Sequence, residues 1–300
     1  MDEKKKLMMI INPAAGRSGY KFNLPDALQL LDSSGYQTTL FFTEGRGDAT
    51  EIARRNAEAF EVAVCIGGDG TLSEMLSGLM LTDPEKRPAV GYIPMGTSND
   101  VATTLDLPKN DALAAVKKML AGVPHPYDVG GFGPGEYFTY IAAFGAFTEV
   151  SYATPQSQKR ALGHLAYVLQ GAATLPYIES YRTRVEFDDG VVEADLVYGS
   201  MSNSTSVAGI VRLSEEMVHL GDGISELVLV KTPENILELS EMAESVLSRR
   251  FDSDKLIILH TKKAKFTFEK PVAWTRDGEA GGAHQEIELC NYKAPVRMIF

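Results

Sequence analysis

Cysteine is nearly absent from this chain, which has two among its 300 residues. Cys65 lies inside an apolar run and Cys290 inside a strand-like segment, positions that suit buried thiols in a reducing compartment. The sequence therefore excludes a small secreted fold that is held together by disulfides.

Positive charge is also in short supply. The chain has 29 Lys and Arg residues against 40 Asp and Glu residues, which gives a net charge of -11. Proteins whose main partner is a nucleic acid carry surplus cations that neutralise phosphates. We therefore expect no nucleic-acid partner.

Long hydrophobic runs are missing as well. The N-terminal order of Lys4 to Lys6 followed by an apolar run at 7–11 is that of a signal peptide, but the run is too short and stops at Asn12-Pro13. Residues 137–147, the most apolar stretch elsewhere, fall far below the ~20 residues of a membrane-spanning helix. We expect residues 7–11 to be a strand and the protein to be soluble, or at most peripheral to a membrane.

Several enzyme signatures do not occur. The chain has no Gly-x-x-x-x-Gly-Lys-Ser/Thr loop, no His-Glu-x-x-His and no Cys-x-x-Cys, and its five histidines lack the spacing of metal ligands. What the chain does have is material for a core, since 44% of its residues are hydrophobic, and a length that favours two domains.

The first part of the chain alternates short apolar strands with helical periodicity. Such alternation indicates a parallel sheet with helices on both faces, whose ligands bind beyond the carboxyl ends of the strands. Strands are predicted at 7–11, 37–42, 62–66 and 89–93, and helices around 24–31, 49–60, 72–81, 101 and 112–120.

After Gly122 the predicted strands follow one another directly, which indicates antiparallel pairing. Asp188-Asp189-Gly190 predicts a hairpin because Asp-Gly supplies the positive φ of a tight turn. Strands are predicted at 137–144, 181–187, 191–201, 226–230, 256–260 and 264–268, and helices at 161–174 and 233–250, the second with Thr232 as its cap. We expect an α/β domain over 1–125, a β-rich, sandwich-like domain over 126–293, and a last strand within 294–300 that returns to the first domain.

The most informative turn is Gly67 to Thr71, which follows the apolar run at 62–66 and precedes a predicted helix. Glycines let the backbone approach a phosphate, and the N-terminus of a helix favours an anion. Asp69 is then placed to hold a metal or a ribose hydroxyl. Taken alone, the turn is equally well explained as an ordinary loop with a capping Asp.

Other loops at the same predicted sheet edge share this design. The loop after the first strand contains Arg17 among small residues, and Thr43 ends the second strand. Thr97 follows the fourth strand, where Asn99 or Asp100 is able to contact a sugar or a metal. Later in the chain come Asp222-Gly223 and Asp277-Gly278-Glu279. Each of these taken alone is explained as a simple turn.

Together the loops resemble, in chain order, the motifs of the diacylglycerol kinase catalytic-domain family, bacterial lipid kinases that are related to sphingosine and ceramide kinases. The Gly67 to Thr71 motif alone is shared with NAD kinases and is similar in phosphofructokinases, whereas Gly-Thr-x-Asn-Asp with a distal Asp-Gly-Glu is typical of the lipid kinases. The resemblance covers essentially the whole chain and rests on Asn12-Pro13 with Gly16, Gly67 to Thr71, Gly96-Thr97 with Asn99-Asp100, Asp222-Gly223, and Asp277-Gly278-Glu279.

This resemblance implies an N-terminal nucleotide-binding domain like that of phosphofructokinase and NAD kinase, and a β-rich domain that takes the acceptor. It assigns the N-terminal loops to ATP, and a carboxylate beside bound phosphates implies that Mg²⁺ intervenes at Asp69. The expected nucleotide-binding residues are Asn12, Pro13, Ala14, Ala15, Gly16, Thr43, Gly67, Gly68, Asp69, Gly70, Thr71, Thr97, Asn99 and Asp100.

Two further sites follow from the resemblance. Asp277 or Glu279 is expected to be the base that accepts the proton of the acceptor hydroxyl, with Asp277 the first choice. A structural Mg²⁺ is expected at the Asp222 carboxylate with the carbonyls of His219 and Ile224. The chain departs from the usual pattern there, because Gly221 stands where many relatives have a second Asp.

The function that these expectations describe is an ATP-dependent lipid kinase, which most simply forms phosphatidic acid from diacylglycerol. The alternatives are an NAD kinase, a kinase for a long-chain base, polyprenol or monoacylglycerol, and a non-catalytic nucleotide-binding regulator. A lipid acceptor implies a cytoplasmic protein in peripheral contact with the inner face of the membrane, as a monomer or a homodimer. Candidate docking residues are Arg17, Lys21, Lys159, Arg160 and His164, although a solvated surface explains these residues better than docking does.

Overall fold

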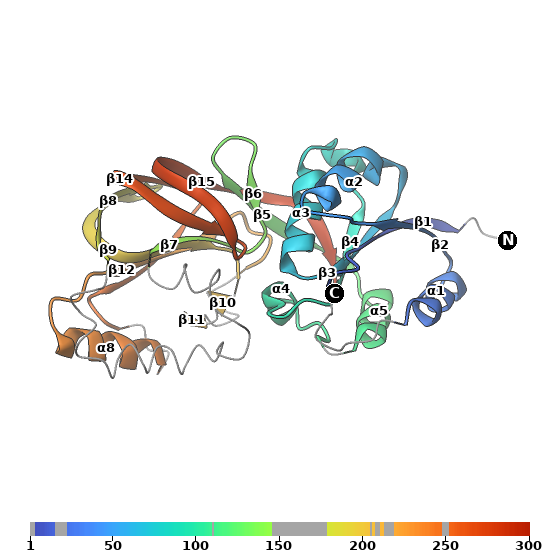
Figure 1. Cartoon of the computed structure of the whole chain (residues 1–300), viewed down its shortest axis with the longest axis horizontal. Coiled ribbons are helices and arrows are strands. Elements are labelled where there is room, and N and C mark those ends of the chain that lie inside the picture. The colour runs from blue at the N-terminus through green and yellow to red at the C-terminus, as the bar shows by residue number, and fades with distance from the viewer. Residues whose placement is uncertain are drawn as a thin grey trace. The chain divides into compact units, whose positions relative to one another are not determined.

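The computed structural model describes residues 4–15, 23–109, 111–145, 179–204, 206–207, 211–212, 219–247 and 252–300 (Figure 1). The chain forms two compact units. Unit 1 comprises Met1–Val129, Leu220–Asp222 and Tyr292–Phe300, and unit 2 comprises Gly130–His219 and Gly223–Asn291. The expected helix at 161–174, together with Gly16, Arg17, Lys21, Lys159, Arg160 and His164, lies outside the described residues.

Unit 1 contains a parallel sheet in the order β2-β1-β3-β4, and the last part of β15 runs parallel to β4. Figure 1 shows α2 and α3 on one side of these strands and α1 and α5 on the other. The elements are β1 (Lys5–Ile11), α1 (Leu24–Ser33), β2 (Tyr36–Phe42), α2 (Asp48–Asn56), η1 (Ala57–Ala59), β3 (Val62–Gly67), α3 (Asp69–Met80), η2 (Pro84–Lys86), β4 (Ala89–Pro94), α4 (Asp100–Thr104) and α5 (Ala112–Ala121).

Burial explains why these strands read as apolar runs. Every residue of β3 and β4 is buried, since helices cover both faces of the inner strands. In β2, at the edge of the sheet, half-buried residues alternate with exposed ones over most of the strand. Helix α3 begins at Asp69, three residues before the predicted start at 72, because Gly68 already accepts the first helical hydrogen bond from Leu72 N at 3.1 Å.

The register places the ends of these strands at one level. Ile11 at the end of β1 pairs with Phe42 of β2 and with Ile66 of β3, and Gly67 pairs with Pro94 of β4. All four loops that follow β1, β2, β3 and β4 therefore leave the sheet at the same edge, which is the edge where parallel sheets bind ligands.

Unit 2 is strand-rich and antiparallel, which gives the β-rich second part that the sequence predicts. The strand order is β13-β12-β9-β7-β14-β15, and β8 pairs with both β9 and β14. Its elements are β5 (Pro124–Phe132), β6 (Tyr137–Phe138), β7 (Ile141–Gly145), β8 (Tyr181–Phe187), β9 (Gly190–Ser202), β10 (Ser206–Val207), β11 (Val211–Arg212), β12 (Ser225–Lys231), α8 (Ile236–Leu247), β13 (Leu256–Thr261), β14 (Lys263–Arg276) and β15 (Glu279–Ile299), of which β5 and β15 begin or end in unit 1.

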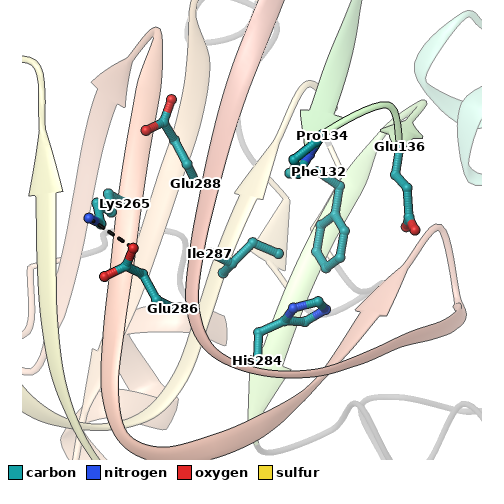
Figure 2. A pocket seen from close by; sticks show the side chains of 9 residues that line it. Phe132, Pro134, Glu136, Lys265, His284, Glu286, Ile287 and Glu288 are labelled. Atoms are coloured by element: carbon teal, nitrogen blue, oxygen red, sulfur yellow. Dashed lines mark ion pairs between the residues drawn. The ribbon is translucent and has the colours of Figure 1, made fainter.

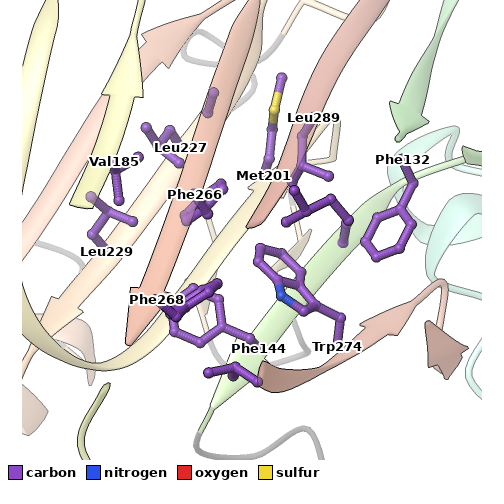
Figure 3. Packing of buried hydrophobic residues seen from close by; sticks show 14 of the residues in the cluster. Phe132, Phe144, Val185, Met201, Leu227, Leu229, Phe266, Phe268, Trp274 and Leu289 are labelled. Atoms are coloured by element: carbon purple, nitrogen blue, oxygen red, sulfur yellow. The ribbon is translucent and has the colours of Figure 1, made fainter. Parts of the chain in front are cut away.

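An aromatic cluster forms the core of unit 2 (Figure 3). The ring of Phe144 lies 4.9 Å from that of Trp274 and 4.9 Å from that of Phe268, and Phe266 lies 5.1 Å from Trp274. The Phe144–Phe268 and Phe266–Trp274 pairs are edge-to-face, and such pairs add ~0.5–1.5 kcal/mol each beyond the burial of their area. The cluster fixes the strands that carry the turn at 277–278.

Three local predictions in unit 2 need correction. The strand predicted at 264–268 continues as β14 to Arg276, past Glu269, Lys270 and Pro271, because its pairing passes from β8 to β7. The hairpin at 188–189 is present, but Gly190 lies in β9 without a positive φ, so the predicted reason is wrong. Asn235 Oδ1, rather than Thr232, accepts the amides of the first turn of α8.

Candidate functional site

The loops after β3 and β4 touch each other through glycine backbone. A Cβ added to Gly96 would lie 2.5 Å from the Cα of Gly68 and 2.7 Å from Asn99 Oδ1. The pairing of β3 with β4 continues into these loops, since Met95 N donates to Gly67 O at 2.7 Å. Only residues without a side chain permit this contact, so packing by itself explains the glycines at positions 68 and 96.

The carboxylate of Asp69 bridges the same two loops. Asp69 is 8% exposed, and its oxygens accept the amides of Asp100 at 2.9 Å and Val101 at 3.3 Å. Asp69 is the first residue of α3, while the amides that it accepts open α4. Because the Asp69 carboxylate accepts hydrogen bonds from these helix-terminal amides, it holds the loop after β4 in position against the loop after β3.

A tyrosine that sequence reasoning missed joins this bridge. Tyr92 of β4 is 1% exposed, and its hydroxyl lies 3.4 Å from Asp69 Oδ1 and 3.3 Å from Asn99 Oδ1. Asn99 has a positive φ of 50°, and its side chain closes the loop on Gly96, accepting from the amide at 3.0 Å and donating to the carbonyl at 2.9 Å. A tyrosine within an apolar strand reads as core, and no sequence signal marked this hydroxyl.

Replacing the hydroxyl tests the role of Tyr92 as a positioning residue. We expect Tyr92→Phe to weaken ATP binding about 5-fold, because the hydrogen bonding of the Tyr92 hydroxyl to Asp69 and Asn99, worth ~1 kcal/mol, is lost. Tyr198→Phe is the matched control, since it removes the hydroxyl of a tyrosine that is also buried and that binds neither Asp69 nor Asn99. Calorimetric ATP affinities and melting temperatures of both variants separate a loss of ATP binding from a loss of stability. Equal ATP affinities of the two variants would contradict the assignment.

The loop after β1 is tied to α3 by one side chain. Asn12 Nδ2 donates to Thr71 Oγ1 at 3.0 Å, and Asn12 Oδ1 accepts the amide of Ala14 at 2.9 Å. Gly67 leaves room for Thr71, because a Cβ there would lie 2.7 Å from the Thr71 side chain. Asn12 and Thr71 therefore join the loops after β1 and β3.

The remaining predicted nucleotide-binding residues lie on the same loops. Thr43 is buried at the end of β2, where its amide donates to Ile11 O at 2.9 Å, and Thr97 is exposed. Pro13 and Ala14 are exposed, and Ala15, Gly68, Gly70 and Asp100 are half-buried. The described members of this set in unit 1 are thus brought together along one sheet edge.

Cys65 of β3 lies just before this edge but is not a nucleophile. Burial, with the nearby Asp69 carboxylate, raises the pKa of the Cys65 thiol far above its ordinary value. The thiol stays protonated and is chemically inert.

The turn at 277–278 in unit 2 is organised around the Asp277 side chain. Asp277 is 6% exposed, and its carboxylate accepts the amides of Thr139 at 2.7 Å, Tyr140 at 3.0 Å and Ile141 at 3.2 Å. These bonds interrupt the strand predicted at 137–144 and divide it into β6 and β7, because the two intervening amides bind Asp277.

The backbone conformation of the turn at 277–278 is one that Asp and Gly adopt readily. Asp277 and Gly278 have positive φ values of 50° and 80°, the conformation of a tight hairpin in which Asp-Gly is favoured. Arg276 pairs with Glu279 across the hairpin, and Glu279 is exposed. The two carboxylates that sequence reasoning grouped thus differ: Asp277 is a buried acceptor of backbone amides, while Glu279 presents its side chain to solvent.

The residues predicted to hold a structural metal lie in the loop that leads to β12. Asp222 and Ile224 are half-buried and His219 is exposed. No cluster of three His, Cys, Asp or Glu side chains suited to a metal ion occurs in the described part of the chain. A site built from one carboxylate and two carbonyls has fewer side-chain ligands than such a cluster.

Packing explains the glycine at position 221. A Cβ on Gly221 would lie 2.7 Å from Pro126 Cβ and 2.8 Å from Pro126 O, so an Asp at this position requires the backbone of β5 to move. The fully buried Asp128 of β5 lies beside this loop, since its amide donates to Leu220 O at 2.6 Å and its carboxylate accepts Ala294 N at 2.6 Å. Sequence reasoning missed Asp128, which is set in an otherwise apolar strand.

A pocket of about 260 Å³ opens on unit 2 between β15 and the turn after β5 (Figure 2). It is lined by Glu136, Glu286 and Glu288, with Lys265 paired to Glu286 at 3.0 Å. Glu136 is paired with Arg276, so both nearby cations are already in ion pairs with carboxylates, which disfavours a phosphate. None of the predicted site residues lines this pocket.

None of the helices in the described parts of the chain has the length and the apolar character needed to cross a membrane.

The sequence model described as "Diacylglycerol kinase catalytic domain" matches residues 6–132. The chain is also similar to diacylglycerol kinase of Bacillus subtilis, with 34% identity over 281 residues, 93% of this chain and 91% of the relative. Diacylglycerol kinase of Staphylococcus saprophyticus is 35% identical over 286 residues, 93% of this chain and 90% of that protein.

Solved structures support the fold. A putative diacylglycerol kinase from Bacillus anthracis superposes with a TM-score of 0.80 at 24% identity and covers 100% of this chain and 98% of its own. An NAD kinase from Archaeoglobus fulgidus in complex with ATP superposes with a TM-score of 0.54 at 14% identity, over 98% and 93% of the two chains. The expected fold class, an N-terminal α/β part of the NAD-kinase kind with a β-rich second part, is confirmed.

Proposed function

Since the chain belongs to the diacylglycerol kinase family, we propose that this lipid kinase transfers the γ-phosphoryl group of ATP to the free hydroxyl of diacylglycerol, with phosphatidic acid and ADP as products. The observation that carries this proposal is the similarity to proteins named diacylglycerol kinase over nine tenths of both chains.

The edge of the unit 1 sheet supports the ATP half of the proposal. Glycine backbone, the N-terminus of α3 and the Asn12–Thr71 pair converge where the four strands end. Backbone amides at a helix N-terminus favour the negative charge of phosphate. The Gly68–Gly96 contact brings the loops after β3 and β4 within reach of one anion. We assign the described nucleotide-binding residues of unit 1 to the ATP site on this basis.

Phosphoryl transfer requires few covalent events from the protein. The acceptor hydroxyl oxygen forms a bond to the γ-phosphorus, the bond from that phosphorus to the bridging oxygen of ADP breaks, and the hydroxyl proton passes to a base. We propose Glu279 as this base, in reverse of the order favoured by sequence alone, because the Asp277 oxygens are already bound to three backbone amides. Asp277 is then a positioning residue that holds the hairpin on which Glu279 lies.

Mg²⁺ bound with ATP supplies charge neutralisation at the phosphate oxygens. Asp69 suits contact with metal-bound water better than direct ligation, since both its oxygens accept backbone amides. Asp222 with the carbonyls of His219 and Ile224 remains our proposal for a separate structural Mg²⁺, and Gly221 limits it to a single carboxylate.

A lipid acceptor also places the protein at a membrane surface. We propose a peripheral contact with the bilayer, in which the acceptor hydroxyl is taken from the headgroup region while the acyl chains stay in the lipid. The net charge of -11 opposes binding to anionic lipid, so the contact requires a local surface of lower negative charge.

An acceptor panel tests the proposed substrate. The purified protein is incubated with Mg²⁺-ATP and, at equal mole fraction in mixed micelles, with diacylglycerol, monoacylglycerol, a long-chain base or a polyprenol. We expect kcat/KM for diacylglycerol to exceed that of each other lipid by 10-fold or more, on the order of the discrimination that one lost binding contact produces. A higher value for another lipid would transfer the assignment to that acceptor.

A further inference from the structure

The exposed part of the loop after β4 is Thr97 and Ser98, since Met95 and Asn99 on either side are buried. Lys109, in the connection between α4 and α5, reaches back to this loop. Its Nζ donates to Ser98 O at 3.3 Å and to the hydroxyl of Thr103. The ammonium therefore lies against the outer part of the same loop whose inner part touches Gly68.

Both partners of this ammonium are uncharged. Some other lysines of unit 1 are paired with carboxylates: Lys118 pairs with Asp106 at 2.9 Å and Lys86 with Glu58 at 3.2 Å. Within the described residues, Lys109 forms no ion pair. Its charge is held in place by neutral oxygen atoms and is not neutralised by them.

The four loops at this sheet edge need such a charge. Among their described residues, Arg46 is the one cation, against Glu44, Asp48, Asp69 and Asp100. The phosphate chain of a nucleoside triphosphate carries several negative charges, which repel these carboxylates unless cations stand between them. Lys109 lies outside the loops in sequence but is bound to one of them in space.

We propose that Lys109 is a phosphate-contacting residue, whose ammonium binds the anionic phosphate chain of the nucleotide beside Thr97. The inference rests on the proposed use of ATP and adds to it a cation that no motif marks. Ser98 O and Thr103 fix the side chain in an orientation before the nucleotide arrives, which lowers the entropy that binding must overcome.

Titration calorimetry with ATP and with adenosine tests the inference on four forms of the full chain. Lys109→Gln removes the charge but keeps a donor for Ser98 O, Lys109→Arg keeps the charge, and Lys118→Gln removes a neighbouring lysine that is paired with Asp106. We expect Lys109→Gln to weaken ATP binding about 10-fold, as loss of a charge-assisted hydrogen bond does, with adenosine affinity unchanged. Lys109→Arg and Lys118→Gln are expected to bind ATP like the wild type, and the loss in Lys109→Gln is expected to shrink at high salt.

Several results would overturn the inference. Unchanged ATP affinity in Lys109→Gln removes the contact, and an equal loss for ATP and adenosine shows that Lys109 only supports the loop. The same loss in Lys109→Arg shows that charge is not what matters. Wild-type protein that melts cooperatively yet does not bind ATP would instead refute the proposed nucleotide use, and the inference with it.

Discussion

Glu279→Gln is expected to lower phosphoryl transfer by about 10²- to 10⁴-fold, the usual contribution of a general base, while ATP affinity stays at the wild-type value. The amide of glutamine has the shape of the carboxylate but cannot accept the proton of the acceptor hydroxyl. Glu279 is exposed at the start of β15, so this substitution leaves the core of unit 2 intact. Initial rates under saturating ATP and lipid, with ATP binding measured by calorimetry, give both quantities.

Asp277→Asn is the matched comparison for this prediction. Asparagine tolerates the positive φ of position 277, but its amide nitrogen replaces one of the two carboxylate oxygens and cannot accept a hydrogen bond. The substitution therefore loses either the bond from Thr139 N or the bonds from Tyr140 N and Ile141 N. We expect a loss of about 1–3 kcal/mol in the free energy of unfolding, accompanied by reduced transfer. Full transfer in Glu279→Gln with near-zero transfer in a stable Asp277→Asn protein would make Asp277 the base.

Gly96→Ala is expected to have the largest effect on the nucleotide site. The new Cβ would lie 2.5 Å from the Cα of Gly68, and no rotation of a side chain relieves a clash with backbone. The loops after β3 and β4 must separate, which we expect to weaken ATP binding at least 10-fold and to cost about 1–3 kcal/mol of stability, as overpacking does.

Gly45→Ala provides the control for this substitution. Gly45 lies in the loop after β2 at the same sheet edge, has no atom within 4 Å of an added Cβ and has no positive φ. The free energy of unfolding of the Gly45→Ala variant is expected to stay within about 0.5 kcal/mol of the wild-type value. Chemical denaturation and ATP titration of both variants decide the matter; wild-type ATP binding in Gly96→Ala would show that the Gly68–Gly96 contact is not part of the site.

The parallel sheet of unit 1 was predictable because its strands are buried on both faces. The runs at 62–66 and 89–93 became β3 and β4 with at most one further residue at the end, and glycine turns marked where they stop. Helix ends were less predictable. Asp69 reads as a loop residue, yet it opens α3, because the hydrogen bonds that start a helix depend on the conformation of Gly68.

Contacts between residues far apart in the sequence account for what sequence reasoning missed. Asp277 binds amides of residues 136 to 138 positions earlier, and Tyr92 reaches Asp69 across 23 positions. Local pattern shows only that position 92 is apolar and buried, since the partner of its hydroxyl depends on how two strands are paired. The loops of the candidate site were therefore predictable, whereas the burial of Asp277 and the exposure of Glu279 were not.

One labelling reaction tests the central claim most directly. The protein is mixed with Mg²⁺, γ-labelled ATP, diacylglycerol vesicles and NAD in the same tube, and the lipid and aqueous phases are separated and chromatographed. A lipid kinase of the proposed kind moves the label into phosphatidic acid in the organic phase and leaves NAD unlabelled. Label in NADP, or release of labelled phosphate without a labelled lipid, would contradict the account.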